Sequence, residues 1–133
     1  MGRYQDAFDD IFAVFDTVAW KAESIKTFPN NFTGTVGSNE YIRVTVLTGG
    51  PSLNEKSISG QTIIEIFIPA GNGPYRAVQI ADKLDSYLVG KNFMTDGKST
   101  QFLFSSLTPK GNDTVNPSLY CMIYSIPFNH TGV

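Results

Sequence analysis

The sequence is poor in the residues on which metal sites and nucleophilic enzymes depend. Its 133 residues include one histidine, His130, and one cysteine, Cys121. A structural zinc site needs about four such ligands, and a Cys–His pair needs both groups in one place. One cysteine also excludes an internal disulfide. We expect Cys121 to be an inert core residue of a strand and His130 to lie in a fraying tail.

Charge and long apolar runs are also scarce. Charged residues make up 17% of the chain, the net charge is −2, and no basic run occurs, which argues against a dedicated nucleic-acid binder. No apolar stretch approaches the roughly 20 residues that cross a bilayer. The N-terminus carries acids and no apolar segment, so a cleaved signal is not expected. The sequence therefore predicts no membrane partner and synthesis in the cytoplasm.

The chain is long enough for one domain, residues 1–133, that buries roughly two-thirds of its unfolded surface. The clearest signature lies between Gly60 and Gly90, where a β-branched run ends at Pro69, a glycine turn follows, and apolar residues then recur with helical spacing. The other elements follow from the same periodicities. The predicted helices cover about residues 4–16 and 74–89, and the predicted strands cover 41–48, 62–68, 100–107 and 119–128.

This order of elements predicts an α+β fold. We expect a two-layer sandwich in which a mixed, mostly antiparallel four-stranded sheet carries both helices on one face. Residues 21–40 are predicted to be irregular, because turn residues cluster there.

The second face of such a sheet has no helix to cover it, and its side chains are not those of a face that meets only water. Aromatic residues, Met and Arg are enriched at protein interfaces, so this face is a candidate subunit interface. An alternative is that the sheet curls and is packed by residues 21–40 and its own loops. The predicted interface residues are Tyr41, Arg43, Ile63, Glu65, Phe67, Tyr120, Met122 and Tyr124.

The turn at Gly71–Gly73 lies between a strand and a helix, where dinucleotide folds bind phosphates. However, Arg76 stands where a third glycine would be, and no Gly-Lys-Ser/Thr follows. A plain left-handed turn explains both glycines. The acidic residues are scattered, without a catalytic pair. We therefore expect no enzyme and no catalytic, cofactor-binding or metal-binding residues.

With these residues in view, the chain resembles the tail terminator or tail-completion proteins of long-tailed phages and prophages. The resemblance rests on order and spacing over about a hundred residues, and no single piece of it is diagnostic. The matching residues are Trp20, Phe28-Pro29, Glu40–Val44, Gly60-Gln61, Glu65–Gly73, Ala77, Ala81–Leu84 and Tyr124–Phe128.

The resemblance implies a virion protein that forms a hexameric ring at the head-proximal end of the tail. Such a ring caps the tail tube, ends its polymerisation and docks the head connector, while DNA passes through without specific binding. It also implies contacts with the tube or a neighbour through the loop after the strand 41–48, at Leu53, Asn54, Glu55, Lys56 and Ile58. Two alternatives remain: a neck or head-completion ring protein, and a small phosphate- or nucleotide-binding enzyme that uses the Gly71–Gly73 turn.

Overall fold

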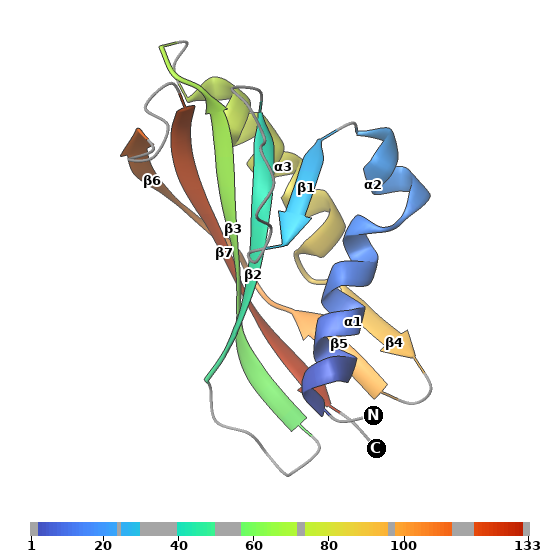
Figure 1. Cartoon of the computed structure of the whole chain (residues 1–133). Coiled ribbons are helices and arrows are strands. Elements are labelled where there is room, and N and C mark those ends of the chain that lie inside the picture. The colour runs from blue at the N-terminus through green and yellow to red at the C-terminus, as the bar shows by residue number, and fades with distance from the viewer. Residues whose placement is uncertain are drawn as a thin grey trace.

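The computed structural model describes residues 3–23, 25–29, 40–49, 57–71, 74–95, 98–112 and 119–131. Within these ranges the chain forms three helices and seven strands (Figure 1). In chain order they are α1 (Arg3–Phe15), α2 (Val18–Ala22), β1 (Lys26–Pro29), β2 (Tyr41–Thr48), β3 (Ser57–Pro69), α3 (Tyr75–Leu88), β4 (Asn92–Thr95), β5 (Lys98–Phe102), β6 (Ser106–Asn112) and β7 (Leu119–Thr131).

All seven strands belong to one mixed sheet. The strand order is β1-β2-β3-β7-β5-β4, and β6 also pairs with β7. The β1–β2 pair is parallel, whereas every other pair is antiparallel. The two longest strands, β3 and β7, lie side by side over 13 residues each and form the centre of the sheet.

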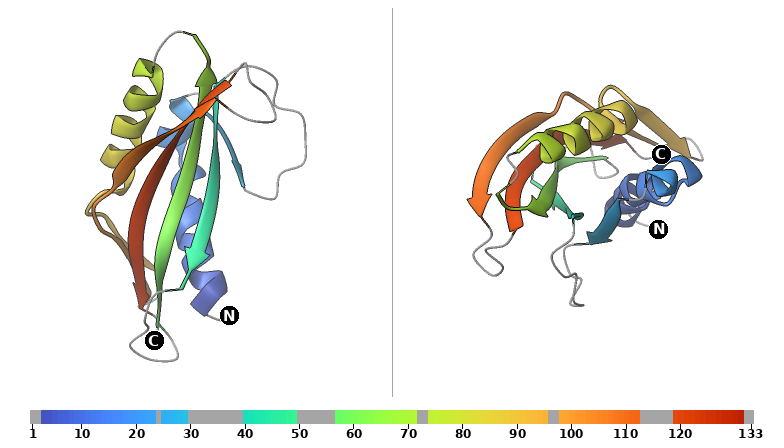
Figure 2. Two further views of the ribbon diagram at one scale, coloured as in Figure 1. Left: turned by 90° about the vertical axis from the view of Figure 1, so that its left-hand side faces the viewer. Right: turned by 90° about the horizontal axis from the view of Figure 1, so that it is seen from above.

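The two long helices lie on the same face of this curled sheet (Figure 2). Helix α3 buries Ala77, Ile80, Ala81, Leu84 and Leu88, which recur at helical spacing. They pack with Ile64, Ile66 and other apolar residues of the central strands in one large core. The α+β class and the placement of both long helices on one face are confirmed.

The number of strands was predicted wrongly. Residues 26–29, within a segment predicted to be irregular, form β1 and add a parallel strand beside β2. The strand predicted at 100–107 is two strands, because the chain leaves the ladder at Leu103 and rejoins the same edge of β7 further along. A β4–β5 pair extends the sheet beyond β5. The result is a curled seven-stranded sheet rather than a four-stranded sandwich.

The C-terminal strand is also longer than predicted. His130 belongs to β7, pairs with Ile58 of β3 and Thr100 of β5, and is 1% exposed. The expectation of a fraying tail was wrong at this residue, because strands on both sides of β7 hold it in the sheet.

Candidate functional site

The face of the sheet opposite α1 and α3 is called here the open face. In Figure 2, left, this face points toward the viewer and both long helices lie behind it. In the sheet, Arg43 of β2 lies opposite Glu65 of β3, and Glu65 lies opposite Ile123 of β7. Because side chains alternate along a strand, Ile63 also lies on this face. The strand alternation predicted this placement of Arg43, Ile63 and Glu65.

Three predicted interface residues lie on the other face. In the ladder, Ile68 opposes Tyr120, Ile66 opposes Met122 and Ile64 opposes Tyr124, so all three β7 residues face the helices. Met122 and Tyr124 belong to the large core, and Tyr120 packs against it. The Tyr124 hydroxyl donates a hydrogen bond to Asp85 Oδ1 of α3 at 2.7 Å. The prediction placed Tyr120, Met122 and Tyr124 on the wrong face of the sheet. It failed because residues 119–128 are apolar on both faces of the strand, so their pattern does not show which face is inside.

Tyr41 and Phe67 lie on the open face as predicted, but they are not surface residues. Their rings stack at 4.5 Å between centroids, and the two residues are 6% and 1% exposed. Leu119 and Cys121 complete a small second core, against which Phe28 packs. This part of the prediction is corrected: the two aromatic side chains are buried within one chain and cannot form a subunit contact. Cys121 is an unbridged core residue, as expected.

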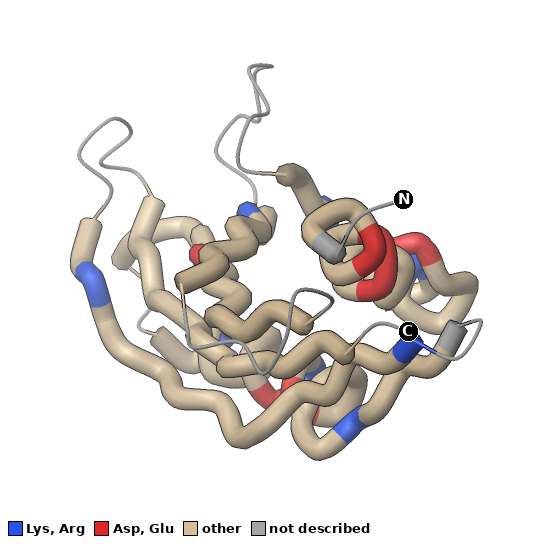
Figure 3. Tube along the Cα trace, turned by 90° about the horizontal axis from the view of Figure 1, so that it is seen from below, with Lys and Arg blue, Asp and Glu red and all other residues tan. Residues whose placement is uncertain are grey.

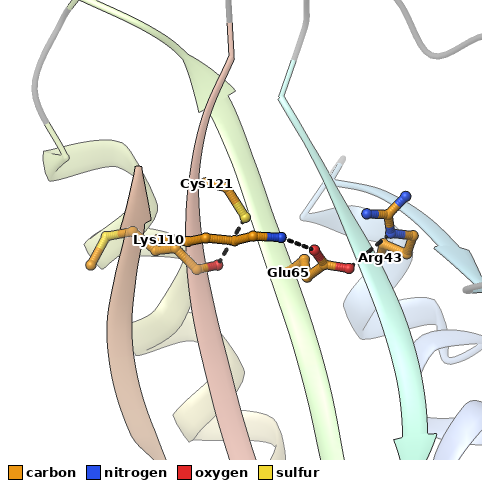
Figure 4. Close-up of polar contacts among 5 residues, drawn as sticks. Arg43, Glu65, Lys110 and Cys121 are labelled. Carbon is orange, nitrogen blue, oxygen red and sulfur yellow. Dashed lines mark hydrogen bonds and ion pairs between the residues drawn. The ribbon is translucent and has the colours of Figure 1, made fainter. Parts of the chain in front are cut away.

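Glu65 is the centre of an ion-pair network on the open face (Figure 4). Arg43 Nε donates to its Oε1 at 3.0 Å and Lys110 Nζ to its Oε2 at 3.3 Å. The Arg43 guanidinium also lies 5.2 Å from the centroid of the Phe67 ring. Partial burial raises the pKa of the Glu65 carboxyl, but the hydrogen bonds and charges of Arg43 and Lys110 outweigh this and hold it below its usual value. The network ties β2, β3 and β6 together across the sheet.

An open groove of about 540 Å³ follows the open face beyond this network. Its lining includes Leu47 of β2, Gln61 of β3, Pro127 of β7 and Leu103. Leu47 and Leu103 are 52% and 39% exposed, respectively. This half of the open face therefore presents two exposed leucines among polar lining residues such as Thr48, Gln61 and Asn129, whereas the other half is filled by the small core.

The loop predicted to contact the tube is described only in part. Leu53, Asn54, Glu55 and Lys56 lie outside the described residues. Ile58 belongs to β3, is 4% exposed and packs in the large core. The predicted contact of Ile58 with the tube or a neighbour was wrong, because β3 begins earlier than the sequence suggested and buries this side chain.

The glycine turn before α3 offers little for a phosphate. Gly71 has a φ of +94°, as a left-handed turn requires, whereas Asn72 and Gly73 lie outside the described residues. Arg76, in the first turn of α3, already binds Glu40 through two hydrogen bonds of 2.6 and 2.9 Å. This guanidinium is neutralised by a carboxylate of its own chain.

A buried polar chain joins α1 to the sheet. The Thr100 hydroxyl donates to Asp10 Oδ2 at 2.7 Å and lies 2.7 Å from His130 Nδ1. Because this hydroxyl has a single proton, the neutral imidazole donates to it from Nδ1. Nearby, Lys98 pairs with Asp6 at 2.9 Å. The acidic turns of α1 lie near the N-terminus in Figure 3, where basic residues are scattered along the trace. The hydrogen bond between Thr100 and Asp10 was not predicted from the sequence, because the two residues lie 90 positions apart in the chain.

Among the described residues, no group of three or more His, Cys, Asp or Glu side chains could hold a metal ion. The same residues include no helix long and apolar enough to span a membrane. The described residues thus bring together an ion-pair network, an open groove and a buried histidine.

No protein-family model matches the chain, and no curated protein is significantly similar to it in sequence. A solved structure resembles it with a TM-score of 0.68 over 98% of this chain and 95% of the other. The two sequences are 15% identical. At this identity the similarity shows the mixed α+β fold and nothing about function.

Proposed function

We propose that this protein is a non-enzymatic virion assembly protein, a tail terminator of a long-tailed phage or prophage. In this role it forms a hexameric ring that caps the tail tube, ends its polymerisation and provides the docking face for the head connector. The ring belongs to the head-proximal end of the tail, and DNA passes through it without specific binding.

The observation that carries the proposal is a set of exposed or half-buried apolar side chains on the open face. Leu47 and Leu103 are exposed beside the groove, and Ile63 is half-buried next to the ion-pair network. A sheet face that met only water would be polar at these positions. The sequence resemblance to tail terminators adds the specific function, because its matching segments include the first half of β2, the end of β3 and the middle of β7.

The surface of the chain is large enough for ring contacts. Its accessible surface is 7437 Å². Two head-to-tail contacts of about 800 Å² per partner would bury about a fifth of this area. Head-to-tail contacts close into rings when the rotation between neighbours allows it.

The two alternative functions, a neck ring and a phosphate- or nucleotide-binding enzyme, would be supported by different observations. A neck or head-completion ring would use the same surface, and its binding partner would distinguish it. A phosphate- or nucleotide-binding enzyme has no supporting contact in the described structure, since Arg76 is paired with Glu40. Micromolar nucleotide binding by calorimetry that Gly73→Val abolishes would favour this enzyme over the assembly protein.

Electron microscopy with purified tail tubes tests the proposal. We expect the wild-type protein to cap one end of each tube and to make tube length uniform during polymerisation. Leu47→Arg, on the open face, should abolish capping while leaving the circular dichroism spectrum unchanged. Met94→Arg is the matched control, because Met94 is 70% exposed on β4. Tubes left uncapped and of uncontrolled length by the wild-type protein would contradict the proposal.

A further inference from the structure

Three residues between β5 and β6, Leu103–Ser105, connect the two faces of the sheet. Leu103 lines the groove of the open face together with Leu47 and Pro127. The Ser105 hydroxyl instead bonds to α3, which lies on the opposite face. In Figure 2, left, this segment and α3 lie at the same side of the sheet. The segment therefore joins a helix on one face to the groove on the other.

The partner of Ser105 on α3 is a carboxylate that accepts from two donors. The Ser105 hydroxyl donates to Asp85 Oδ1 at 2.6 Å, and the Tyr124 hydroxyl donates to the same oxygen at 2.7 Å. Tyr124 is 1% exposed, and burial together with the hydrogen bond to Asp85 raises the pKa of its hydroxyl. The hydroxyl therefore stays protonated at neutral pH and donates to the carboxylate. Asp85 thus offers Ser105 an acceptor whose position is set by both α3 and β7.

Among the described residues, two hydrogen bonds hold the segment. One joins the Leu103 amide to the Pro127 carbonyl at 3.0 Å, and the other is the bond from Ser105 to Asp85. The first bond has neutral partners, whereas the second has a carboxylate acceptor, and charge-assisted hydrogen bonds are roughly twice as strong as neutral ones. The segment lies between the β5 and β6 ladders and belongs to neither. We therefore expect its position to depend mainly on Asp85.

The segment carries two exposed apolar side chains. Leu103 is 39% exposed and Phe104 is 84% exposed. Side chains on a loose segment lose conformational entropy when a partner orders them, whereas an anchored segment has already lost most of this entropy. Anchoring by Asp85 therefore favours a contact that is made through Leu103.

We propose that Asp85 is a positioning residue for the contact at the open face. Through Ser105 it holds Leu103 beside the groove, in the position in which the next copy of the chain contacts this face. This inference rests on the proposed ring, because the ring supplies the partner. Asp85 acts from the opposite face and does not touch that partner.

Amide hydrogen exchange tests the anchoring in the single chain. The Leu103 amide is a direct probe, because its hydrogen bond to Pro127 breaks when the segment leaves the sheet. Ser105→Ala should accelerate exchange of this amide by about tenfold, as expected when a hydrogen bond to a charged group is lost. Exchange of the amides at the centre of β3 and β7 should stay unchanged, since those amides report global unfolding.

Two variants serve as matched controls. Ser105→Thr keeps the hydroxyl and should restore the slow exchange of the Leu103 amide. Ser86→Ala makes the same substitution as Ser105→Ala on the exposed side of α3, where the Ser86 hydroxyl bonds only to the Lys83 carbonyl at 2.7 Å. It should leave exchange of the Leu103 amide unchanged.

Capping of purified tail tubes tests the role in assembly. Ser105→Ala should raise the protein concentration that caps half of the tubes by about threefold or more, because the position of Leu103 that binds is occupied for a smaller fraction of the time. Ser105→Thr and Ser86→Ala should cap tubes at the wild-type concentration.

The failure of this inference and the failure of the proposed function give different results. Unchanged Leu103 exchange in Ser105→Ala, or fast exchange that Ser105→Thr does not restore, would overturn the anchoring. Fast exchange with capping at the wild-type concentration would overturn the role in assembly, and the proposed function would stand. If the wild type leaves tubes uncapped, the terminator function is wrong and the role in assembly with it, while the exchange rates still decide whether Asp85 holds the segment.

Discussion

At the scale of residues, Glu65 is the carboxylate at the centre of the ion-pair network on the open face. Its side chain is 17% exposed and accepts from two cations, Arg43 and Lys110. We expect Glu65→Gln to lower the free energy of unfolding by about 1–2 kcal/mol, because hydrogen bonds to charged groups are lost. Urea denaturation at pH 7 measures this. Lys110→Gln, which removes the 53% exposed partner, should cost less than about 0.5 kcal/mol.

The same network makes a prediction about acid stability. The folded state holds the pKa of Glu65 below its ordinary value of 4.5. Its contribution to stability is therefore complete above pH 4.5 and is lost as the pH falls through the lower, folded pKa. The difference in unfolding free energy between the wild type and Glu65→Gln should shrink below pH 4.5. A difference that stays constant from pH 6 to pH 3 would show that the carboxylate charge does not contribute.

The pKa of His130 should be lowered, whereas acidic neighbours raise the pKa of an exposed histidine. Burial lowers its pKa below the ordinary 6.5, and the charges of Asp10 and Asp6 only partly offset this. The unfolded chain then binds more protons below pH 6.5, so stability should fall as the pH drops from 6.5 through the folded pKa. Because His130 is the only histidine, its imidazole NMR signals report this pKa directly. A measured value at or above 6.5 would contradict the burial seen here.

At the scale of elements, the β2–β3 ladder depends on the absence of a side chain at Gly60. A Cβ there would meet the Leu47 carbonyl oxygen at 1.9 Å, a backbone atom that cannot move aside cheaply. We expect Gly60→Ala to destabilise the chain by roughly 2–3 kcal/mol, in the range of overpacked sites. Gly49→Ala is the matched control, because its Cβ would meet nothing within 4 Å. Thermal unfolding of the two variants should differ by several degrees.

The elements also show how far the sequence could predict the fold. Clean alternation predicted β2 at its observed bounds, and helical spacing predicted α3 to within a residue at each end. The break between β5 and β6 was not predictable in this way, because it depends on the distant hydrogen bond between Leu103 and Pro127. The same limit applied to the candidate site: alternation placed Arg43 and Glu65, whereas a strand apolar on both faces hid the true orientation of Tyr124.

At the scale of the whole molecule, one sheet separates a large core from a small one. Neighbouring residues such as Ile66 and Phe67 are both buried, at 0% and 1% exposure, on opposite sides. A curled sheet with two cores unfolds as one unit if both sides depend on the same strand pairing. Substitutions on the open face should therefore have two different effects. Those at residues that fill the small core should lower the stability of the chain, whereas those at residues that face outward should weaken assembly.

Phe67 and Ile63 test this separation, because both were predicted to be interface residues and only one of them is fully buried. Phe67→Ala removes a ring from the small core and should lower the free energy of unfolding of the single chain by about 3–5 kcal/mol. Ile63→Ser should cost less than about 1 kcal/mol, since Ile63 is only half-buried, and should instead weaken capping of tail tubes. Urea denaturation at low protein concentration measures the first effect, and electron microscopy of tubes measures the second. Equal losses of chain stability in the two variants would mean that the open face is a uniform core, covered by its own chain and not by a neighbour.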